Sequence, residues 1–260
     1  MAFLLRLLKD FPLYVWSGWG ALASIFLLLA LWEWGNQLYG SLTLPSPKET
    51  FTALAQLTLQ AEFWQALSTT LQRAIVGLFL SIVFGSVLGM LAGAFVATSI
   101  LSRPLVTVVM GTPPIAWVVL AMIWFGMSDQ SVIFTVVVAS MPIVFVGALQ
   151  GMRTLEGQYD EMAKSFKAPL LQRFTDVYFP HVVAYLFPAW IAALGMSWKI
   201  VIMAELLSTQ DGMGGALAVA RSHFDSALAM ALIVSMVLLL LVIEYVVFEP
   251  VKREVESWRS

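Results

Sequence analysis

Residues 156–180 read EGQYDEMAKSFKAPLLQRFTDVYFP, the longest strongly polar run between two very apolar regions of the chain. Within this run, Tyr159, Met162, Ala163 and Phe166 recur at helical spacing, which predicts a helix with one apolar face. Acidic residues crowd the start of that helix and lysines its end, the order that suits the helix macrodipole. We therefore expect a helix in water whose apolar stripe needs a partner.

This helix is expected to stop at Ala168, because the residue before a proline is pushed out of the helical region. Pro169 can then open a second short helix, since proline suits the first helical position. The polar run thus predicts a helix–turn–helix within a loop over residues 151–180.

The spacing of the run resembles the EAA loop in the membrane permease subunits of ABC importers, whose pattern is E-A-A, three residues, G, nine residues, then I-x-L-P. Here Glu161-Met162-Ala163 is followed by three residues, Lys167, nine residues and Val177-Tyr178-Phe179-Pro180. Met162 replaces an Ala of the pattern, and Lys167 replaces its Gly. Because Lys tolerates positive φ poorly, we expect Pro169 to take over the turn, slightly later in the chain.

The composition predicts a membrane protein. Of the 260 residues, 60% are hydrophobic and 12% are charged, unlike the balance in soluble domains. A helical span needs about 20 apolar residues, so little of the chain remains for a soluble domain. Cysteine is absent, which excludes disulfides and thiolate metal sites. No G-x-x-x-x-G-K-[ST] phosphate loop is present, so ATP hydrolysis is expected on a separate ATPase chain.

We expect one permease domain over residues 1–260, an all-α membrane protein with six transmembrane helices. Residues 1–13 are interpreted as a short amphipathic helix on the membrane surface, in preference to a cleaved signal peptide. The expected spans are Tyr14–Leu31, Ala74–Val96, Leu105–Phe125, Val132–Leu149, Val182–Leu207 and Ala227–Phe248.

Two features flank the second span. Leu44-Pro45-Ser46-Pro47 predicts a rigid extended piece, followed by a helix over Phe51–Arg73 near the membrane surface. In the span itself, Gly85, Gly89 and Gly93 recur every fourth residue and allow another helix to approach closely. Packing within the chain is favoured over a dimer seam.

The third span contains Gly111-Thr112-Pro113-Pro114, which breaks backbone hydrogen bonding inside the bilayer. Such a break is tolerated only where neighbouring protein or a water-lined cavity satisfies the freed groups. The stretch GTPPIAWVVLAMIWFG resembles the matching span of the nitrate/sulfonate/taurine-type permeases. A packing kink and a role beside the substrate path for Pro113 and Pro114 are equally supported.

The fifth span carries two charges, Lys199 and Glu205, within an apolar run. Intramembrane charges normally face the bundle interior or a water-filled cavity. Glu205 lies close to the polar end and can reach water. For Lys199, an ion pair with a carboxylate such as Glu33 or Glu244 is favoured over attraction of an anionic substrate.

The stretch SWKIVIMAELLSTQDGMGGAL, which includes Trp198, resembles the family's W-K-x-x-x-x-A-E then G-x-G segment near the outer end of the pathway. The candidate residues of the translocation path are Pro113, Pro114, Trp198, Lys199 and Glu205. Ser208–Asp225 is expected to form a polar loop with a glycine turn. His181 and His223 are interpreted as ordinary polar residues, so no metal site is expected.

The resemblance implies the fold of a type I ABC importer permease, with a coupling-helix loop in the cytoplasm. Most Lys and Arg residues fall on the cytoplasmic side if both termini lie there, in agreement with the positive-inside rule. The residues it assigns to ATPase coupling are Tyr159, Glu161, Met162, Ala163, Lys164, Phe166, Lys167 and Pro180. A large charged residue in place of Ala163 is then expected to uncouple transport while leaving the protein folded.

The function implied is ATP-driven import of a small anionic solute, such as nitrate, a sulfonate, taurine or bicarbonate, across the bacterial inner membrane by alternating access. The implied partners are ATPase subunits that hold ATP and Mg, a solute-binding protein and a second permease copy. This chain itself is expected to bind no cofactor and no nucleic acid. The alternative is a secondary transporter driven by an ion gradient, with an ion site near Lys199, although no inverted repeat is apparent. A membrane enzyme is disfavoured because no cluster of His or carboxylates suits acid–base or metal chemistry.

Overall fold

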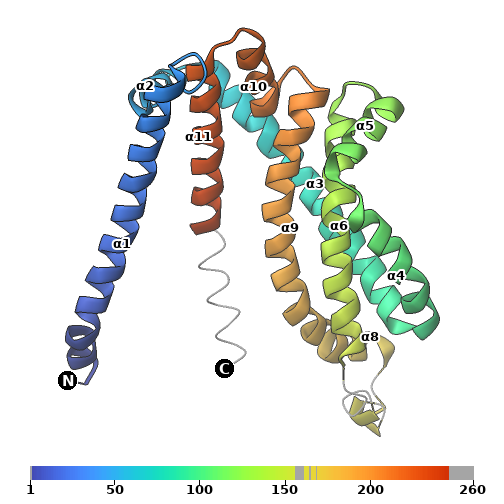
Figure 1. Cartoon of the computed structure of the whole chain (residues 1–260). Helices are drawn as coiled ribbons and strands as arrows, with labels where there is room; N and C mark the ends of the chain where they lie inside the picture. The colour runs from blue at the N-terminus through green and yellow to red at the C-terminus, as the bar shows by residue number, and fades with distance from the viewer. Residues whose placement is uncertain (1, 156–160, 164, 168, 246–260) are drawn as a thin grey trace. The chain divides into compact units, whose positions relative to one another are not determined.

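The computed structural model describes residues 2–155, 161–163, 165–167 and 169–245, and these residues form helices joined by turns, with no strand (Figure 1). The first half of the chain holds α1 (Ala2–Tyr39), α2 (Pro47–Leu57), α3 (Ala61–Ala94), α4 (Val96–Gly111), α5 (Pro114–Phe125) and α6 (Asp129–Arg153). The second half holds α8 (Leu170–Arg173), the π-helix η1 (Phe174–Tyr178), α9 (Phe179–Ser208), α10 (Gly212–Ser222) and α11 (Ser226–Ile243).

The chain divides into two compact units. Unit 1 comprises Met1–Leu59 and Ala220–Val234, and unit 2 comprises Gln60–Val219 and Ser235–Ser260. That residues 1–260 form a single permease domain stays a prediction.

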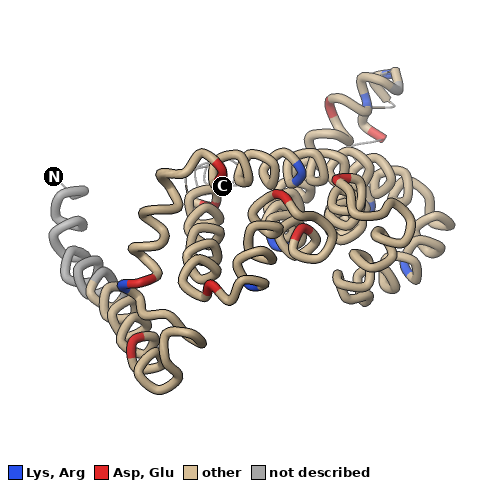
Figure 2. Tube along the Cα trace, turned by 90° about the horizontal axis from the view of Figure 1, so that it is seen from above, with Lys and Arg blue, Asp and Glu red and all other residues tan. Residues whose placement is uncertain are grey.

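Four helical segments in the described part of the chain are long and apolar enough to cross a membrane: Ala61–Ala94, Asp129–Arg153, Leu171–Ser208 and Ser226–Ile243. The helices α4 and α5 form a fifth span if the pair, bent by 93°, counts as one broken crossing. The expected count of six spans is not confirmed. Figure 2 shows how few charged residues lie along the helices of either unit, which agrees with their membrane character.

The N-terminal expectation of a separate surface helix over residues 1–13 is wrong, because α1 runs unbroken from Ala2 to Tyr39. Pro12 removes one backbone hydrogen bond, and a single proline can bend a helix without ending it. The extended piece expected over Leu44–Pro47 is shorter, because Leu44 lies in a bend and Pro47 already begins α2. Ser46 has β-region angles and caps α2 through a capping box with Glu49, and Pro47 occupies the first turn. The backbone N–H of Ser46 donates to Glu49 Oε2 over 2.9 Å and lowers the pKa of that carboxyl.

The helix expected over Phe51–Arg73 is wrong in its bounds. α2 ends at Leu57, and α3 begins at Ala61 and continues through the second expected span. Between them the Thr58 hydroxyl donates to the Ala55 carbonyl over 2.9 Å, a side-chain bond that competes with helix continuation. Gln60 then takes extended angles before α3.

The core of unit 2 lies where α6 packs against α3 on one side and α9 on the other. Two buried clusters fill it: Val118, Val132, Val136, Ile200, Val201 and Ala204 form one, and Val144, Ala148, Val182, Leu186 and Ala193 form the other. Between α6 and α9, Ser140 Oγ and Ser197 Oγ share a buried hydrogen bond of 2.9 Å.

The glycine stripe of α3 lies against α6, as expected for packing within the chain. A Cβ on Gly85 would meet the Met141 carbonyl oxygen at 2.8 Å, and one on Gly93 would meet Met152 Cβ at 2.5 Å. At Gly89 the gap is smallest, with the Phe145 carbonyl oxygen 2.4 Å from such an atom. These distances show that the two backbones touch at a separation that only glycine permits.

Gly89→Ala is therefore expected to lower the stability of the chain by about 1–3 kcal/mol, because α3 must move away from α6 to seat one methyl group. The matched control is Gly195→Ala in α9, where an added Cβ meets no heavy atom within 4 Å. Alanine is the better helix former, so this control should be neutral or stabilising by up to about 1 kcal/mol. Thermal unfolding of both variants in detergent, followed by circular dichroism, measures the difference. Equal melting temperatures for the two would contradict close packing at Gly89.

The expected polar loop over Ser208–Asp225 is also wrong, since most of it is the helix α10. The glycines that predicted a loop instead begin this helix, with Gly212 at a φ of +79°. Met213 and Ala220 are buried, so α10 has apolar positions to pack that a loop would leave in water.

Candidate functional site

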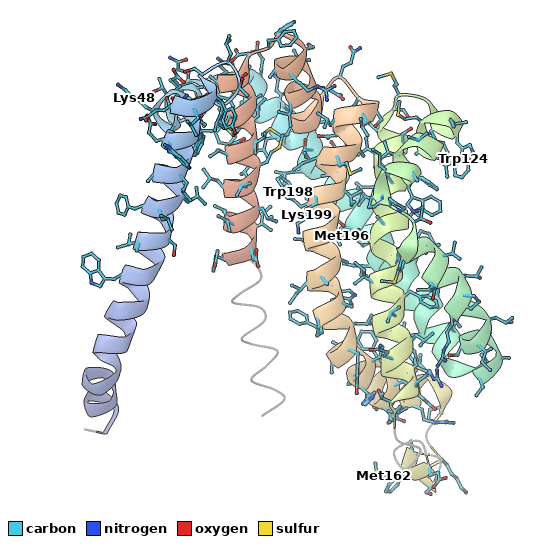
Figure 3. All side chains as sticks on the ribbon, in the orientation of Figure 1. Lys48, Trp124, Met162, Met196, Trp198 and Lys199 are labelled. Carbon is cyan, nitrogen blue, oxygen red and sulfur yellow. The ribbon has the colours of Figure 1, made fainter. Side chains whose placement is uncertain are left out.

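The segment Glu161–Lys167 exposes two large apolar side chains. Phe166 is 80% exposed and Met162 54% exposed, and the Phe166 N–H donates to the Met162 carbonyl over 3.2 Å, so both lie on one helical turn. Figure 3 shows Met162 beyond the ends of α6 and α8 in unit 2. Ala163 is buried and Glu161 is exposed. Tyr159 and Lys164 lie outside the described residues.

The turn after this segment falls at Lys167, which adopts a φ of +53°. The expectation that Pro169 would take over the turn is therefore wrong. Proline has φ fixed near −65° and cannot supply the positive φ that reverses the chain. A left-handed conformation costs a lysine about 1 kcal/mol, so local strain is stored where the family pattern has glycine.

Pro169 directly precedes the helix α8, and Pro180 lies in the first turn of α9. The Pro169 carbonyl accepts from the Arg173 N–H over 3.0 Å, so the second short helix forms as expected, one residue later, at Leu170. This first turn of α9 directly follows the π-helical turn η1.

The proline pair Pro113–Pro114 ends one helix and begins the next. The Thr112 N–H donates to the Val108 carbonyl over 3.0 Å, and the Ala116 N–H donates to the Pro113 carbonyl over 2.9 Å. These bonds pair the backbone N–H groups on either side of the proline pair, and the chain turns by 93° between α4 and α5. The expected third span, Leu105–Phe125, is thus two helices.

Trp198 and Lys199 are neighbours on α9 and differ in exposure (Figure 3). The Trp198 indole is buried and donates to the Met236 carbonyl over 3.2 Å. Lys199 is exposed. Every ion pair among the described residues includes Arg73, so the ion pair expected for Lys199 is not found.

Glu205 does not reach water, contrary to expectation. Its side chain is fully buried, and Oε1 accepts from Arg73 Nη1 over 2.8 Å. Oε2 accepts from the Thr70 hydroxyl over 2.8 Å and from the Gly214 N–H over 3.0 Å. The carboxylate is thereby satisfied by donors from α3 and from the start of α10, as a buried charge requires.

Arg73 is the centre of this cluster, with a side chain only 4% exposed. Besides Glu205, its Nη2 donates to Asp211 Oδ1 over 2.7 Å and its Nε donates to Asp129 Oδ1 over 2.9 Å. The side chains of Asp129 and Asp211 are 67% and 68% exposed, so they lie at the solvent-accessible edge of the buried Arg73–Glu205 pair. We call Arg73, Glu205, Asp129 and Asp211 the Arg73 cluster.

A glycine turn closes over the buried carboxylate. An added Cβ on Gly212 would lie 2.4 Å from Glu205 Oε1, and one on Gly214 would lie 2.4 Å from the Ile202 carbonyl oxygen. The Met213 N–H donates to Thr70 Oγ1 over 2.8 Å. Only glycine therefore lets the start of α10 lie this close to Glu205.

The Arg73 cluster joins α3, the first turn of α6, the end of α9 and the start of α10. It has no nucleophile paired with a base, so we assign it a structural role. Its ion pairs hold four segments together at one end of unit 2. An open cavity of about 710 Å³ lies beside it, lined by Met127, Ser128, Thr209 and Gln210 as well as Arg73, Asp129 and Asp211.

Metal chemistry has no support in the described part of the chain, where no three His, Asp or Glu side chains are placed to hold an ion. His181 Nε2 lies 3.3 Å from Thr154 Oγ1, and its ring lies 5.4 Å from that of Tyr185. His223 is exposed.

Comparison with known proteins assigns these features to a family. The model of a family described as "binding-protein-dependent transport system inner membrane component" matches residues 81–250. This range holds the proline break, the glycine stripe, the exposed Met162 and Phe166, and Glu205. The chain belongs to this family. It is the permease subunit of an ABC importer, a transport component with the type I importer permease fold.

Individual relatives are similar over most of the permease. The nitrate import permease protein NrtB of Leptolyngbya laminosa is 30% identical over 157 residues, which cover 60% of this chain and 56% of that protein. The taurine transport system permease protein TauC of Escherichia coli K12 is 26% identical over 75% of this chain and 73% of its own length. The putative aliphatic sulfonates transport permease protein SsuC of Bacillus subtilis 168 is 24% identical over 72% and 68%. The match to NrtB thus spans little more than half of that protein.

The Arg73 cluster is the part of the permease that the sequence analysis missed. Arg73 enters the sequence prediction only as the end of the expected helix Phe51–Arg73, and Glu205 is expected there to reach water. The available signal was two opposite charges, Arg73 at the start of one apolar run and Glu205 inside another, in a chain where buried charges must be paired. The spacing of residues along the sequence does not give the register between α3 and α9. The ion pair between Arg73 and Glu205 could therefore not be predicted.

Proposed function

We propose that this permease moves a small anionic solute inward across the inner membrane, driven by ATPase subunits that dock on the segment Glu161–Lys167. The observation that carries the proposal is the exposure of Met162 and Phe166 on one helical turn. An isolated large apolar pair in water is costly unless another surface covers it, and exposed apolar patches mark interaction sites. The ATPase would supply that surface.

The docking chemistry follows the helix-in-groove mode, in which an amphipathic helix lays its apolar face into a hydrophobic groove. An aromatic side chain buries 150–250 Å², so Phe166 would be the main anchor, with Met162 beside it. Glu161 and Lys167, both exposed, would set the register at the polar rim. ATP and Mg would bind to the ATPase alone, and closure of the ATPase pair would pull this segment.

The membrane orientation follows from charge. We propose that both termini and the Glu161–Lys167 segment lie in the cytoplasm, because Lys and Arg are concentrated on that side in this arrangement. A solute-binding protein would deliver substrate at the opposite end, where the Arg73 cluster lies. A second permease copy would complete the pathway.

The substrate class follows from the relatives and from Lys199. The named solutes of the relatives are nitrate, taurine and aliphatic sulfonates, which all carry an anionic group of oxygens. Lys199 is exposed, without a carboxylate partner in the described part of the chain, next to the buried Trp198 on α9. A cation held within an apolar span attracts anions, so we assign Lys199 to the translocation path with Pro113 and Pro114.

Lys199→Gln is expected to lower the rate of anion uptake at low substrate concentration about tenfold, which corresponds to about 1.4 kcal/mol. The ATPase should still copurify, because Lys199 lies far along the chain from the docking segment. The matched control is Lys48→Gln, which removes an exposed lysine from α2. Uptake that is the same in both variants would exclude Lys199 from the path.

The energy source is tested by reconstitution. The permease is coexpressed with a candidate ATPase and a candidate solute-binding protein, purified, and placed in liposomes with labelled nitrate, taurine or an alkylsulfonate. Uptake that requires ATP and the copurified ATPase supports the proposal. Uptake by the permease alone under a proton or sodium gradient would overturn it in favour of a secondary transporter.

A further inference from the structure

A cavity of about 520 Å³ lies between α4 and α6 in unit 2. Its mouth is polar: Ser102 and Arg103 of α4 face Gln150 and Arg153 of α6. A hydrogen bond of 3.1 Å from Arg153 Nη1 to Ser99 Oγ fixes these ends of the two helices at one level. The mouth therefore lies at the last turn of α6 and at the middle of α4.

The floor of the cavity is apolar. Val106 and Met110 of α4 lie opposite Phe145 and Val146 of α6. Since a helix rises 1.5 Å per residue, Met110 lies about 10 Å deeper than Arg103 along α4. The lining of the cavity thus changes from two arginines at the mouth to apolar side chains at the floor. This depth is comparable to the distance from the headgroup of a lipid to the start of its acyl chains.

The two arginines of the mouth have no carboxylate partner in the part of the chain that the structure describes, where each ion pair includes Arg73. Arg153 donates one N–H to Ser99, and both arginine residues are exposed. Their remaining donors are available to an anion, and guanidinium binds phosphate oxygens in a bidentate fork.

We propose that this cavity binds an anionic phospholipid, with the phosphodiester between Arg103 and Arg153 and one acyl chain along Val106, Met110, Phe145 and Val146. Basic pockets between membrane helices are known to hold anionic headgroups. A free phosphate would leave the floor empty. A second copy of the chain meeting this one symmetrically at the cavity would set like charges together, because an isologous contact pairs a patch with itself.

The test uses the purified full-length permease in detergent and native mass spectrometry, with phosphatidylglycerol, phosphatidylcholine of the same chains, and inorganic phosphate as probes. The arginine pair is removed in Arg103→Gln with Arg153→Gln. The matched control is Lys48→Gln with Arg221→Gln, which removes the same charge from exposed positions elsewhere. Each cation near an anionic headgroup contributes about fivefold in affinity, so the double variant should retain roughly 25-fold less phosphatidylglycerol. The control should retain as much as the wild type.

The floor is tested separately with Val106→Trp, which fills the apolar end and leaves both arginines in place. It should lower phosphatidylglycerol retention without changing the melting temperature. Three outcomes would overturn the proposal: equal retention of phosphatidylglycerol and phosphatidylcholine, binding of inorganic phosphate as strong as that of the lipid, or loss of dimers instead of lipid in the double arginine variant. None of these readouts involves ATP or solute, so failure here is distinct from failure of the proposed function.

Discussion

Phe166→Asp is expected to abolish ATP-driven uptake while the permease remains folded in the membrane. Phe166 is exposed in the chain alone, so its removal takes no packing from the permease itself. In the proposed complex it is the main aromatic anchor, and loss of such an anchor costs an interface at least about 2 kcal/mol, or about 30-fold in affinity. Asp adds the cost of placing a charge in an apolar groove.

The measurement is copurification of the ATPase with the variant permease, followed by uptake in proteoliposomes. Phe224→Asp is the matched control, because Phe224 is 85% exposed and lies at the end of α10, outside the docking segment. Its ATPase yield should equal that of the wild type. If Phe166→Asp retains the ATPase and transports normally, the segment Glu161–Lys167 is not the docking site.

Ala163 is a less suitable position for this test than the sequence indicated. It is buried, so a large charged residue there would disturb the chain's own packing as well as any docked partner. The change at Phe166 separates the two effects, since its side chain is exposed in the chain alone and only the proposed partner would cover it.

Arg73→Met is expected to destabilise the permease by about 3–5 kcal/mol, because Glu205 is then left buried without its cation. Met fills similar volume, so the loss comes from charge and hydrogen bonding and not from a cavity. The exposed Asp129 and Asp211 regain water and contribute little of the cost. Thermal or denaturant unfolding in detergent measures the change, with Arg221→Met as the exposed control.

A double variant tests whether the unpaired charge of Glu205 causes this destabilisation. Arg73→Met with Glu205→Met removes both buried charges, so it should be more stable than Arg73→Met alone. A double variant less stable than the single would show that Glu205 is held by Thr70 and the Gly214 N–H without need of Arg73.

The sequence predicted the features that depend on neighbours along the chain. The glycines of α3 signalled close packing, Pro113–Pro114 signalled the break between α4 and α5, and the apolar runs placed α6 and α9 within a few residues. These features were predictable because their cause lies within one helix or one turn.

The errors share the opposite cause. Arg73 meets partners at 129, 205 and 211, and the choice among many carboxylates depends on the relative register of α3, α6 and α9, which no local pattern contains. At Lys167 a propensity rule gave the wrong turn, because the backbone reversal outweighed the cost of a left-handed lysine. The glycines at 212–215 were interpreted as a loop, whereas they let α10 start against Glu205.

The carboxylates of the Arg73 cluster differ in exposure, so its ion pairs respond differently to ionic strength. Dissolved salt screens attraction between groups in water and acts much less on a buried pair. Concentrated electrolyte should therefore loosen Asp129 and Asp211 from the guanidinium while Glu205 stays attached. Asp129 in the first turn of α6 and Asp211 before α10 would then separate from Arg73 before Glu205 of α9 does. The exposure of each carboxylate thus sets the order in which these segments detach from α3.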